Sequence, residues 1–111
     1  MDIVFKNSKL AKEFADQKTL TLNRGDRQAK LIMRRLSEIN AADSLDVLRQ
    51  IPGARCHELT GDLKGQLSVD LLHPYRLIFV PANEPCPRLP EGGLDWKNVT
   101  SVRILGVQDT H

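Results

Sequence analysis

The sequence has no long run of apolar residues. Its longest apolar stretches are far too short to span a bilayer, and no apolar segment opens the chain, so we expect neither a membrane anchor nor a secretion signal. The opening residues, MDIVFKNSKL, alternate between apolar and polar side chains, which is typical of a strand. Together these features predict a cytoplasmic protein.

Cysteine is scarce, and neither sign of charge greatly exceeds the other. The two cysteines, Cys56 and Cys86, match neither the disulfide framework of a small secreted protein nor the close Cys/His pairs of a zinc site. We therefore expect structural or incidental thiols, and neither a metal ion nor another cofactor. The formal net charge of +2 does not by itself indicate a nucleic-acid partner, so the distribution of the cations must decide.

What the chain does have is the composition of an ordinary globular domain. Its 111 residues support one modest core, and 41% hydrophobic with 27% charged residues exclude a disordered chain. We expect a single domain over residues 1–111. The order of its elements predicts the α+β class, with helices packed against one face of one sheet.

Apolar periodicity predicts the helices in the first half. After a strand over residues 2–5, a helix follows that Asn7 or Ser8 can cap. The stretch TLTLNRGDRQ then interrupts it, with a turn at residues 24–26. The next helix is strongly periodic, because five apolar residues lie in one stripe, three and four apart: Ala29, Ile32, Met33, Leu36 and Ile39. A short extra helix is expected within residues 41–53.

The second half changes to the two-residue period of strands. We expect strands at residues 56–60, 66–72, 75–80 and 99–107, separated in part by turns at residues 61–65 and 73–74. The segment YRLIFV is apolar on both faces except for Arg76, which predicts a central strand covered on both sides. Residues 81–95 are rich in Pro and Gly and predict an irregular loop, a type of segment that is often functional or mobile.

Five cations gather on or just before the strongly periodic helix. Four occupy its other face and the fifth precedes it: Arg27, Lys30, Arg34 and Arg35, with Arg24. Such a face can simply be solvated. It can also bind RNA phosphates, because each cation that neutralises a phosphate releases a condensed counterion.

Arg76 is the more informative cation, since it stands in an apolar strand. A buried charge is costly unless it is paired, so Arg76 either forms an ion pair or projects into a concave polar site. The candidate carboxylates are Glu58, Asp70 and Asp109. We favour a phosphate-binding role, because the guanidinium fork matches phosphate geometry and stays charged.

Three histidines supply groups that transfer protons. His57 falls on an expected strand, His73 in a turn and His111 at the chain end. Each alone is more often a structural residue, yet an ordinary pKa of about 6.5 allows proton transfer near neutral pH. Together with Arg76 they suit RNA cleavage by in-line attack of the 2′-hydroxyl, which needs a base, an acid and fixed cations. Because no carboxylate cluster suggests a metal ion, we expect a metal-free site.

The segment CHELTGDLKGQLSVDLLHPYRLIFV, with RILGVQDTH near the end of the chain, resembles the HigB branch of the RelE/ParE toxin superfamily. The resemblance implies an N-terminal strand and a helical hairpin packed on a curved antiparallel β-sheet. It also implies a toxin of a type II toxin–antitoxin module, an endoribonuclease that enters the ribosome and cuts mRNA without a metal ion. A paired antitoxin, often a helix-turn-helix HigA-like protein, would neutralise it.

The resemblance implies a role for each matching residue. Arg76 would stabilise the phosphate in the transition state, and His57 would face the substrate as a proton-transfer or positioning residue. Asp109 and His111 would complete the catalytic site from the C-terminal tail. The basic helix face would bind ribosomal RNA.

Two positions depart from the family's pattern. HigB toxins usually have a lysine where this chain has Thr60, and Lys64 in the nearby turn can replace that cation at the RNA. They also end Asp-Tyr-His, whereas here Thr110 takes the place of the tyrosine and offers no π face for stacking. Two alternatives therefore stay open. One is a non-enzymatic gyrase inhibitor like the sister ParE branch, and the other is an attenuated toxin that keeps the fold and antitoxin binding.

Overall fold

The computed structural model describes residues 1–110, which form four α-helices and five strands. In chain order these are β1 (Asp2–Phe5), α1 (Ser8–Ala15), α2 (Gln17–Arg24), α3 (Asp26–Ala41), α4 (Leu45–Arg49), β2 (His57–Glu58), β3 (Leu67–Asp70), β4 (Tyr75–Pro81) and β5 (Ser101–Asp109). Two 3₁₀-helices, η1 (Gly61–Leu63) and η2 (Trp96–Asn98), lie in the longer connections. The expected α+β class is confirmed.

The strands form one sheet in the order β1-β5-β4-β3-β2. β2, β3, β4 and β5 pair antiparallel as predicted, whereas β1 runs parallel to β5, with Ile3 opposite Val102. β1 therefore adds a parallel edge strand to the expected antiparallel strands, and the sheet is mixed. A parallel pair needs a crossover connection, which most of the intervening chain supplies.

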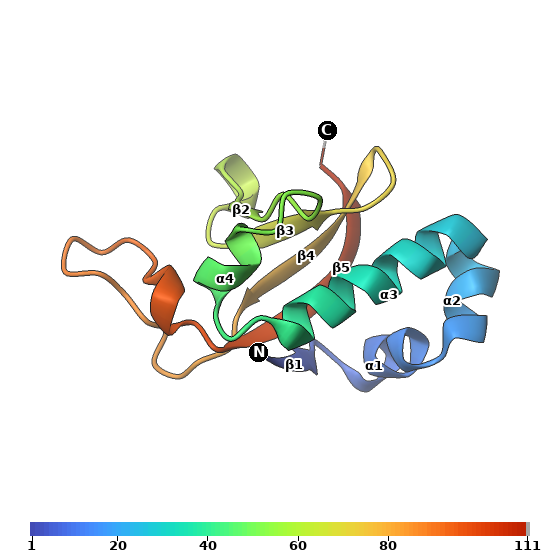
Figure 1. Cartoon of the computed structure of the whole chain (residues 1–111), viewed down its shortest axis with the longest axis horizontal. Helices are drawn as coiled ribbons and strands as arrows, with labels where there is room; N and C mark the ends of the chain where they lie inside the picture. Colours follow the sequence, from blue (N-terminus) through green and yellow to red (C-terminus); the bar gives the residue numbers. More distant parts are fainter. Residues whose placement is uncertain (111) are drawn as a thin grey trace.

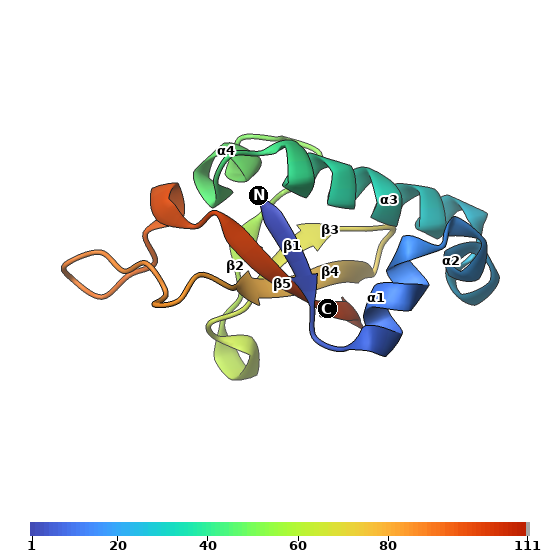
Figure 2. The same cartoon turned by 90° about the horizontal axis from the view of Figure 1, so that it is seen from below.

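Different segments of the chain lie on the two faces of the sheet. α3 and α4 lie across one face, and α1 and α2 pack at one end beside α3 (Figures 1 and 2). The segment that joins β2 to β3 hangs below the opposite face in Figure 2. No helix in the described part of the chain is both long enough and apolar enough to cross a membrane.

The main core lies between α3 and the sheet. Ile32 and Ile39 on the apolar stripe of α3 are fully buried, and so are Leu77 and Phe79 on β4. Between these two strand residues, Ile78 is also fully buried but lies outside the main core cluster. Because successive side chains of a strand point to opposite faces, the middle of β4 is buried on both sides, as predicted.

The interruption expected over residues 19–28 is confirmed only at Gly25, because residues 19–24 belong to α2 and residues 26–28 belong to α3. Asp16 starts a new helix, α2, because its carboxylate accepts hydrogen bonds from the Lys18 amide (3.1 Å) and the Thr19 hydroxyl (2.7 Å). The hydrogen bond from Thr19, with that from Lys18, lowers the pKa of the Asp16 carboxyl. The chain turns only at Gly25, whose φ of 84° favours glycine. The turn itself lies where it was predicted.

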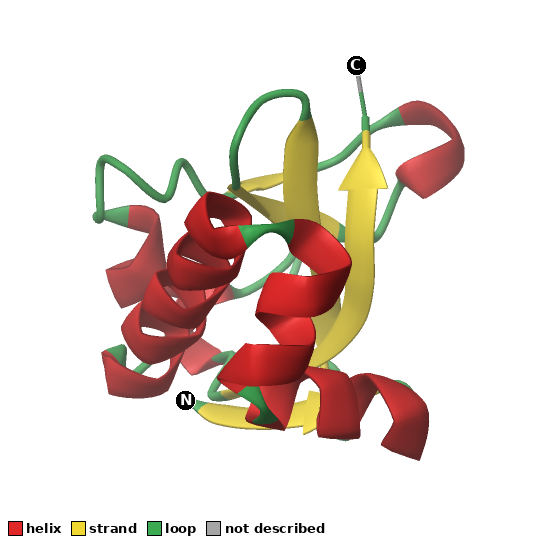
Figure 3. Ribbon diagram, turned by 90° about the vertical axis from the view of Figure 1, so that its right-hand side faces the viewer, coloured by secondary structure: helices red, strands yellow, loops and turns green. Residues whose placement is uncertain are grey.

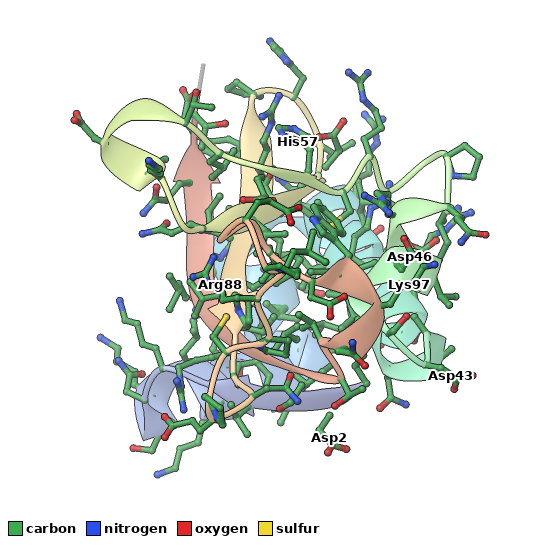
Figure 4. All side chains as sticks on the ribbon, turned by 90° about the vertical axis from the view of Figure 1, so that its left-hand side faces the viewer. Asp2, Asp43, Asp46, His57, Arg88 and Lys97 are labelled. Carbon is green, nitrogen blue, oxygen red and sulfur yellow. The ribbon has the colours of Figure 1, made fainter. Side chains whose placement is uncertain are left out.

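The loop after β4 is irregular, as predicted, and projects from the body of the molecule (Figure 1). An isolated bridge pairs Arg88 with Leu94 inside it. Its end is tied back through Trp96, whose Nε1 donates to Glu58 Oε1 at 3.2 Å. The Arg49 guanidinium lies over the Trp96 ring, 4.6 Å from its centroid. The loop is therefore fastened to β2 and α4, and Figure 4 shows Lys97 of η2 beside Asp46 of α4.

Candidate functional site

Strand alternation places polar residues on the sheet face that α3 does not cover. On β3, Leu67 and Val69 point into the main core, so Ser68 and Asp70 point the other way. β4 is in register with β3, and Arg76 is paired with Asp70. On the short strand β2, His57 is paired with Ser68. We call this surface the open face and define it by His57, Ser68, Asp70, Arg76 and Thr110.

Arg76 contacts two residues of the open face. Its Nη1 lies 3.2 Å from His57 Nε2, and its Nε lies 3.6 Å from Asp70 Oδ1. A guanidinium has only donors, so His57 Nε2 must accept, while Nδ1 lies 3.1 Å from the Glu58 carbonyl oxygen. This arrangement suits a neutral imidazole with its hydrogen on Nδ1. Arg76 thus combines both expected situations, an ion pair with Asp70 and a position in a polar site.

The open face also gathers polar atoms that have no hydrogen-bond partner. Within residues 1–110, the buried side-chain atoms of this kind are Gln66 Oε1, Ser68 Oγ, Asp70 Oδ1, Arg76 Nε and Thr110 Oγ1. They come from β3, from the residue just before it, from β4 and from the residue just after β5. Buried polar groups in folded proteins are normally paired, and a cluster of exceptions is typical of a ligand site.

Arg76 stands between two hollows of the surface. The first hollow has a cavity volume of about 360 Å³. It is lined by His57, Glu58, Leu59, Thr60, Leu63, Arg76 and Thr110. The second hollow, of about 270 Å³, is lined by Arg55, Asp70, Leu71, His73, Tyr75 and Arg76. Figure 4 shows His57 at the end of the molecule remote from Asp2 of β1. The structure brings His57 and Arg76 together in the first hollow, and their catalytic roles stay predictions.

Of the two catalytic residues expected in the C-terminal tail, the structure describes only Asp109. In the pairing of β5 with β4, Gln108 lies opposite Arg76, and the next residue, Asp109, lies opposite Tyr75. Strand alternation places the Asp109 side chain on the other face of β5, and it does not line the hollow of His57. This end of β5 lies beside the start of β4 (Figure 3). His111 lies outside the described residues, so its role stays a prediction.

Thr60 stands where HigB toxins usually have a lysine. It lines the first hollow, together with Leu63 of η1. Lys64 follows directly and is exposed, but it does not line the hollow itself. Its role as a replacement cation stays a prediction.

The prediction that Arg35 belongs to an exposed basic face is wrong. Arg35 is 6% exposed, and its guanidinium donates to Asp70 O (2.7 Å), Gly53 O (2.8 Å) and Glu38 Oε1 (2.8 Å). The reason is its helical position, three residues after Ile32 and four before Ile39, which puts it on the apolar stripe. Arg35 is therefore a structural link between α3 and β3.

The other cations of this region remain at the surface, but several have acidic neighbours. Three ion pairs hold them: Arg24 with Glu13 (3.2 Å), Lys30 with Asp26 (3.1 Å) and Arg34 with Glu38 (3.6 Å). Arg27, Lys30 and Arg34 line one shallow hollow of α3. The exposed basic surface is thus smaller and more strongly neutralised than the sequence suggested.

Two residues of the second hollow were not selected from the sequence. Arg55 lies in the connection before β2, with a φ of 48°, and its Nε is 3.4 Å from Asp70 Oδ2. Tyr75 begins β4 and is 46% exposed. No periodicity marks a loop arginine. The sequence also does not distinguish an exposed aromatic residue at the end of an apolar strand from a buried one.

The cysteines are both free, and only their surroundings differ. Cys56 is 7% exposed, and burial raises the pKa of its thiol to about 12, so it stays protonated near neutral pH. Cys86 is half-buried. In the part of the chain that the structure describes, no three His, Cys, Asp or Glu residues come together as a metal site.

Comparison with protein families decides the relationship. The model of a family described as RelE-like toxin of type II toxin–antitoxin system HigB matches residues 3–86. The chain belongs to this family. The matched part includes His57 and Arg76, and it confirms the resemblance and the RelE-like fold, while Asp109 and His111 lie outside it. No curated protein matches the chain. As a member of the HigB-like family, the protein is a toxin of a type II toxin–antitoxin module and has an antitoxin as its partner.

Proposed function

We propose that this HigB-like toxin is a ribosome-dependent mRNA endonuclease whose reaction takes place on the open face. The observation that carries the proposal is the 3.2 Å contact between Arg76 Nη1 and His57 Nε2 in one hollow. Around this pair lie buried polar atoms without partners. A guanidinium and a neutral imidazole are the groups that phosphodiester cleavage requires at the reacting phosphate.

The proposed reaction is an in-line displacement. His57 Nε2 accepts the proton of the 2′-hydroxyl, whose oxygen attacks phosphorus while the bond to the 5′-oxygen breaks. The products are a 2′,3′-cyclic phosphate and a 5′-hydroxyl. Arg76 turns from His57 to the phosphate and stabilises its developing charge. His111 of the tail donates the proton to the leaving 5′-oxygen, since Asp109 lies on the other face of β5.

The same proposal names the partners. Five cations contact phosphates of ribosomal RNA or mRNA. These are the exposed Arg27, Lys30 and Arg34 of α3, the half-buried Arg24 of α2, and Lys64 near the first hollow. The antitoxin is a helix-turn-helix protein of the HigA type, and the protein works in the cytoplasm where translating ribosomes are found.

A second candidate is an attenuated toxin that keeps the fold and binds its antitoxin. The observation in its favour is Thr110, which lines the first hollow with a buried hydroxyl that has no partner. A threonine can neither stack on a base nor supply a phenolic proton. If this candidate is right, Thr110→Tyr creates cleavage activity that the natural chain lacks.

The experiment is cleavage of mRNA on programmed ribosomes, with mapping of the cut ends. We compare the natural chain, His57→Ala and a chain that lacks His111, with Arg88→Ala in the distant loop as the control. Cleavage by the natural chain and by the control, with a loss in both other variants, supports the endonuclease. Intact message with gyrase-dependent DNA breaks instead supports a gyrase inhibitor. Intact message without such breaks, and normal growth on overexpression, supports the attenuated toxin.

A further inference from the structure

We propose that the second hollow is a nucleotide subsite, in which Arg55 binds a phosphate and Tyr75 stacks on a base next to the cleaved bond. This inference rests on the proposed function, because it places the neighbouring nucleotide of the same RNA strand. Its starting point is the position of Arg76, which lines both hollows. A strand that crosses Arg76 leaves the first hollow and enters the second.

Asp70 holds two guanidinium groups at this boundary. Its Oδ1 lies 3.6 Å from Arg76 Nε, and its Oδ2 lies 3.4 Å from Arg55 Nε. One carboxylate thus faces two cations, so a positive charge is left over in the second hollow. Two guanidiniums oriented by one carboxylate are a suitable frame for successive phosphates, because each fork can bind phosphate oxygens with two parallel hydrogen bonds.

Arg55 is both accessible and conformationally unusual. Its side chain is 72% exposed, although its Nε is fixed toward Asp70. Its φ of 48° lies in the left-handed region, which is unfavourable for a residue with a Cβ. Backbone strain of this kind is concentrated at ligand sites, where it aims a side chain.

Tyr75 supplies the flat surface that a base requires. It lines the second hollow and also a neighbouring hollow beside α2 and α3, and the residue is 46% exposed. His73 lines the same hollow from the turn before β4. An aromatic ring beside a guanidinium is the usual pairing for single-stranded RNA, in which the ring stacks on the base and the cation binds the backbone.

The test is binding of two fluorescein-labelled hexanucleotides, measured by fluorescence anisotropy. One carries bases and 2′-O-methyl groups, which prevent in-line attack, and the other has the same backbone without bases. Tyr75→Ala should weaken binding of the base-bearing probe about tenfold or more and leave the abasic probe unchanged. Tyr75→Phe should bind both probes like the natural chain. Arg55→Ala should weaken both probes, and Arg88→Ala in the distant loop should weaken neither.

Two results would overturn the subsite. One is equal binding of the two probes by the natural chain, and the other is unchanged binding in both Tyr75→Ala and Arg55→Ala. Cleavage on programmed ribosomes separates this failure from that of the proposed function. If the natural chain cuts mRNA and both variants cut equally well, the endonuclease stands and the subsite is wrong. If the natural chain does not cut but the binding pattern holds, the subsite stands and the endonuclease is wrong.

Discussion

The two faces of the sheet differ in how their polar groups are paired. On the face covered by α3, Val69, Leu77 and Phe79 are fully buried in the main core. One residue along the same strands, Ser68 and Arg76 carry buried polar atoms that make no hydrogen bond. A shift of one position along a strand separates a surface that stabilises the fold from one that is suited to bind a ligand.

The comparison also holds for two arginines with little exposure. Arg35, on the covered side, donates to two backbone carbonyls and to Glu38. Arg76, on the open face, contacts His57 through Nη1 but leaves Nε without a hydrogen bond. A guanidinium whose three nitrogens all donate hydrogen bonds is a structural element, whereas one whose Nε makes none keeps a donor for a phosphate. Exposure alone does not distinguish the two roles, but hydrogen-bond partners do.

The largest effect on stability is expected for Arg35→Ala. This change removes the donors of two carbonyl oxygens and the nearer of the two arginines that pair with the half-buried Glu38, so the free energy of unfolding should fall by about 3–5 kcal/mol. The matched control is Arg34→Ala, whose side chain is 72% exposed and should change stability by less than about 0.5 kcal/mol. Urea unfolding followed by circular dichroism measures both. An equal loss of unfolding free energy in the two variants would contradict the structural role of the buried Arg35.

Adjacent residues of β3 allow the two faces to be compared directly. Val69→Ala should cost about 2 kcal/mol, because a fully buried side chain loses its apolar contacts. Ser68→Ala removes a buried hydroxyl without a partner, so stability should stay unchanged or rise by about 1 kcal/mol. Urea midpoints of the two variants decide the matter. A marked loss in Ser68→Ala would mean that the open face contributes to folding like the covered one.

A smaller effect concerns Cys56 and alkaline pH. Because burial raises its pKa from 9.0 to about 12, the folded state favours the protonated thiol. Its contribution to stability is therefore complete below pH 9 and is lost as the pH rises from 9 towards 12, by about 1.4 kcal/mol per pH unit. Unfolding measured at pH 8 and pH 10 should show a smaller pH dependence in Cys56→Ala. The same pH dependence in both proteins would contradict this account, and Cys86→Ser serves as the control.

Much of the fold follows from short-range sequence patterns. The stripe of α3 and the alternation of β3 identify those elements because one face of each is buried. β5 lies two residues later than expected, since the end of a strand depends on its partner. The parallel pairing of β1 with β5 joins residues about a hundred positions apart, and no local pattern encodes the direction of such a pair.

The site was predicted in part for the same physical reasons. His57 and Arg76 were selected because their residue types conflict with an apolar strand, and their contact confirms that the conflict has a local cause. The burial of Arg35 had a signal that was missed, namely its spacing from Ile32 and Ile39. The neighbourhood of Arg55 and Asp70 had none, because it depends on how a loop meets β3.

The most direct test of the account pairs two measurements on Arg76→Ala. Cleavage of mRNA on programmed ribosomes should fall by about a hundredfold to a thousandfold, as expected when a group that stabilises transition-state charge is removed. The free energy of unfolding should fall by much less than in Arg35→Ala, because Arg55 still faces Asp70. Undiminished cleavage, or a loss of stability as large as that of Arg35→Ala, would contradict the claim that the open face binds the substrate and the covered face holds the fold.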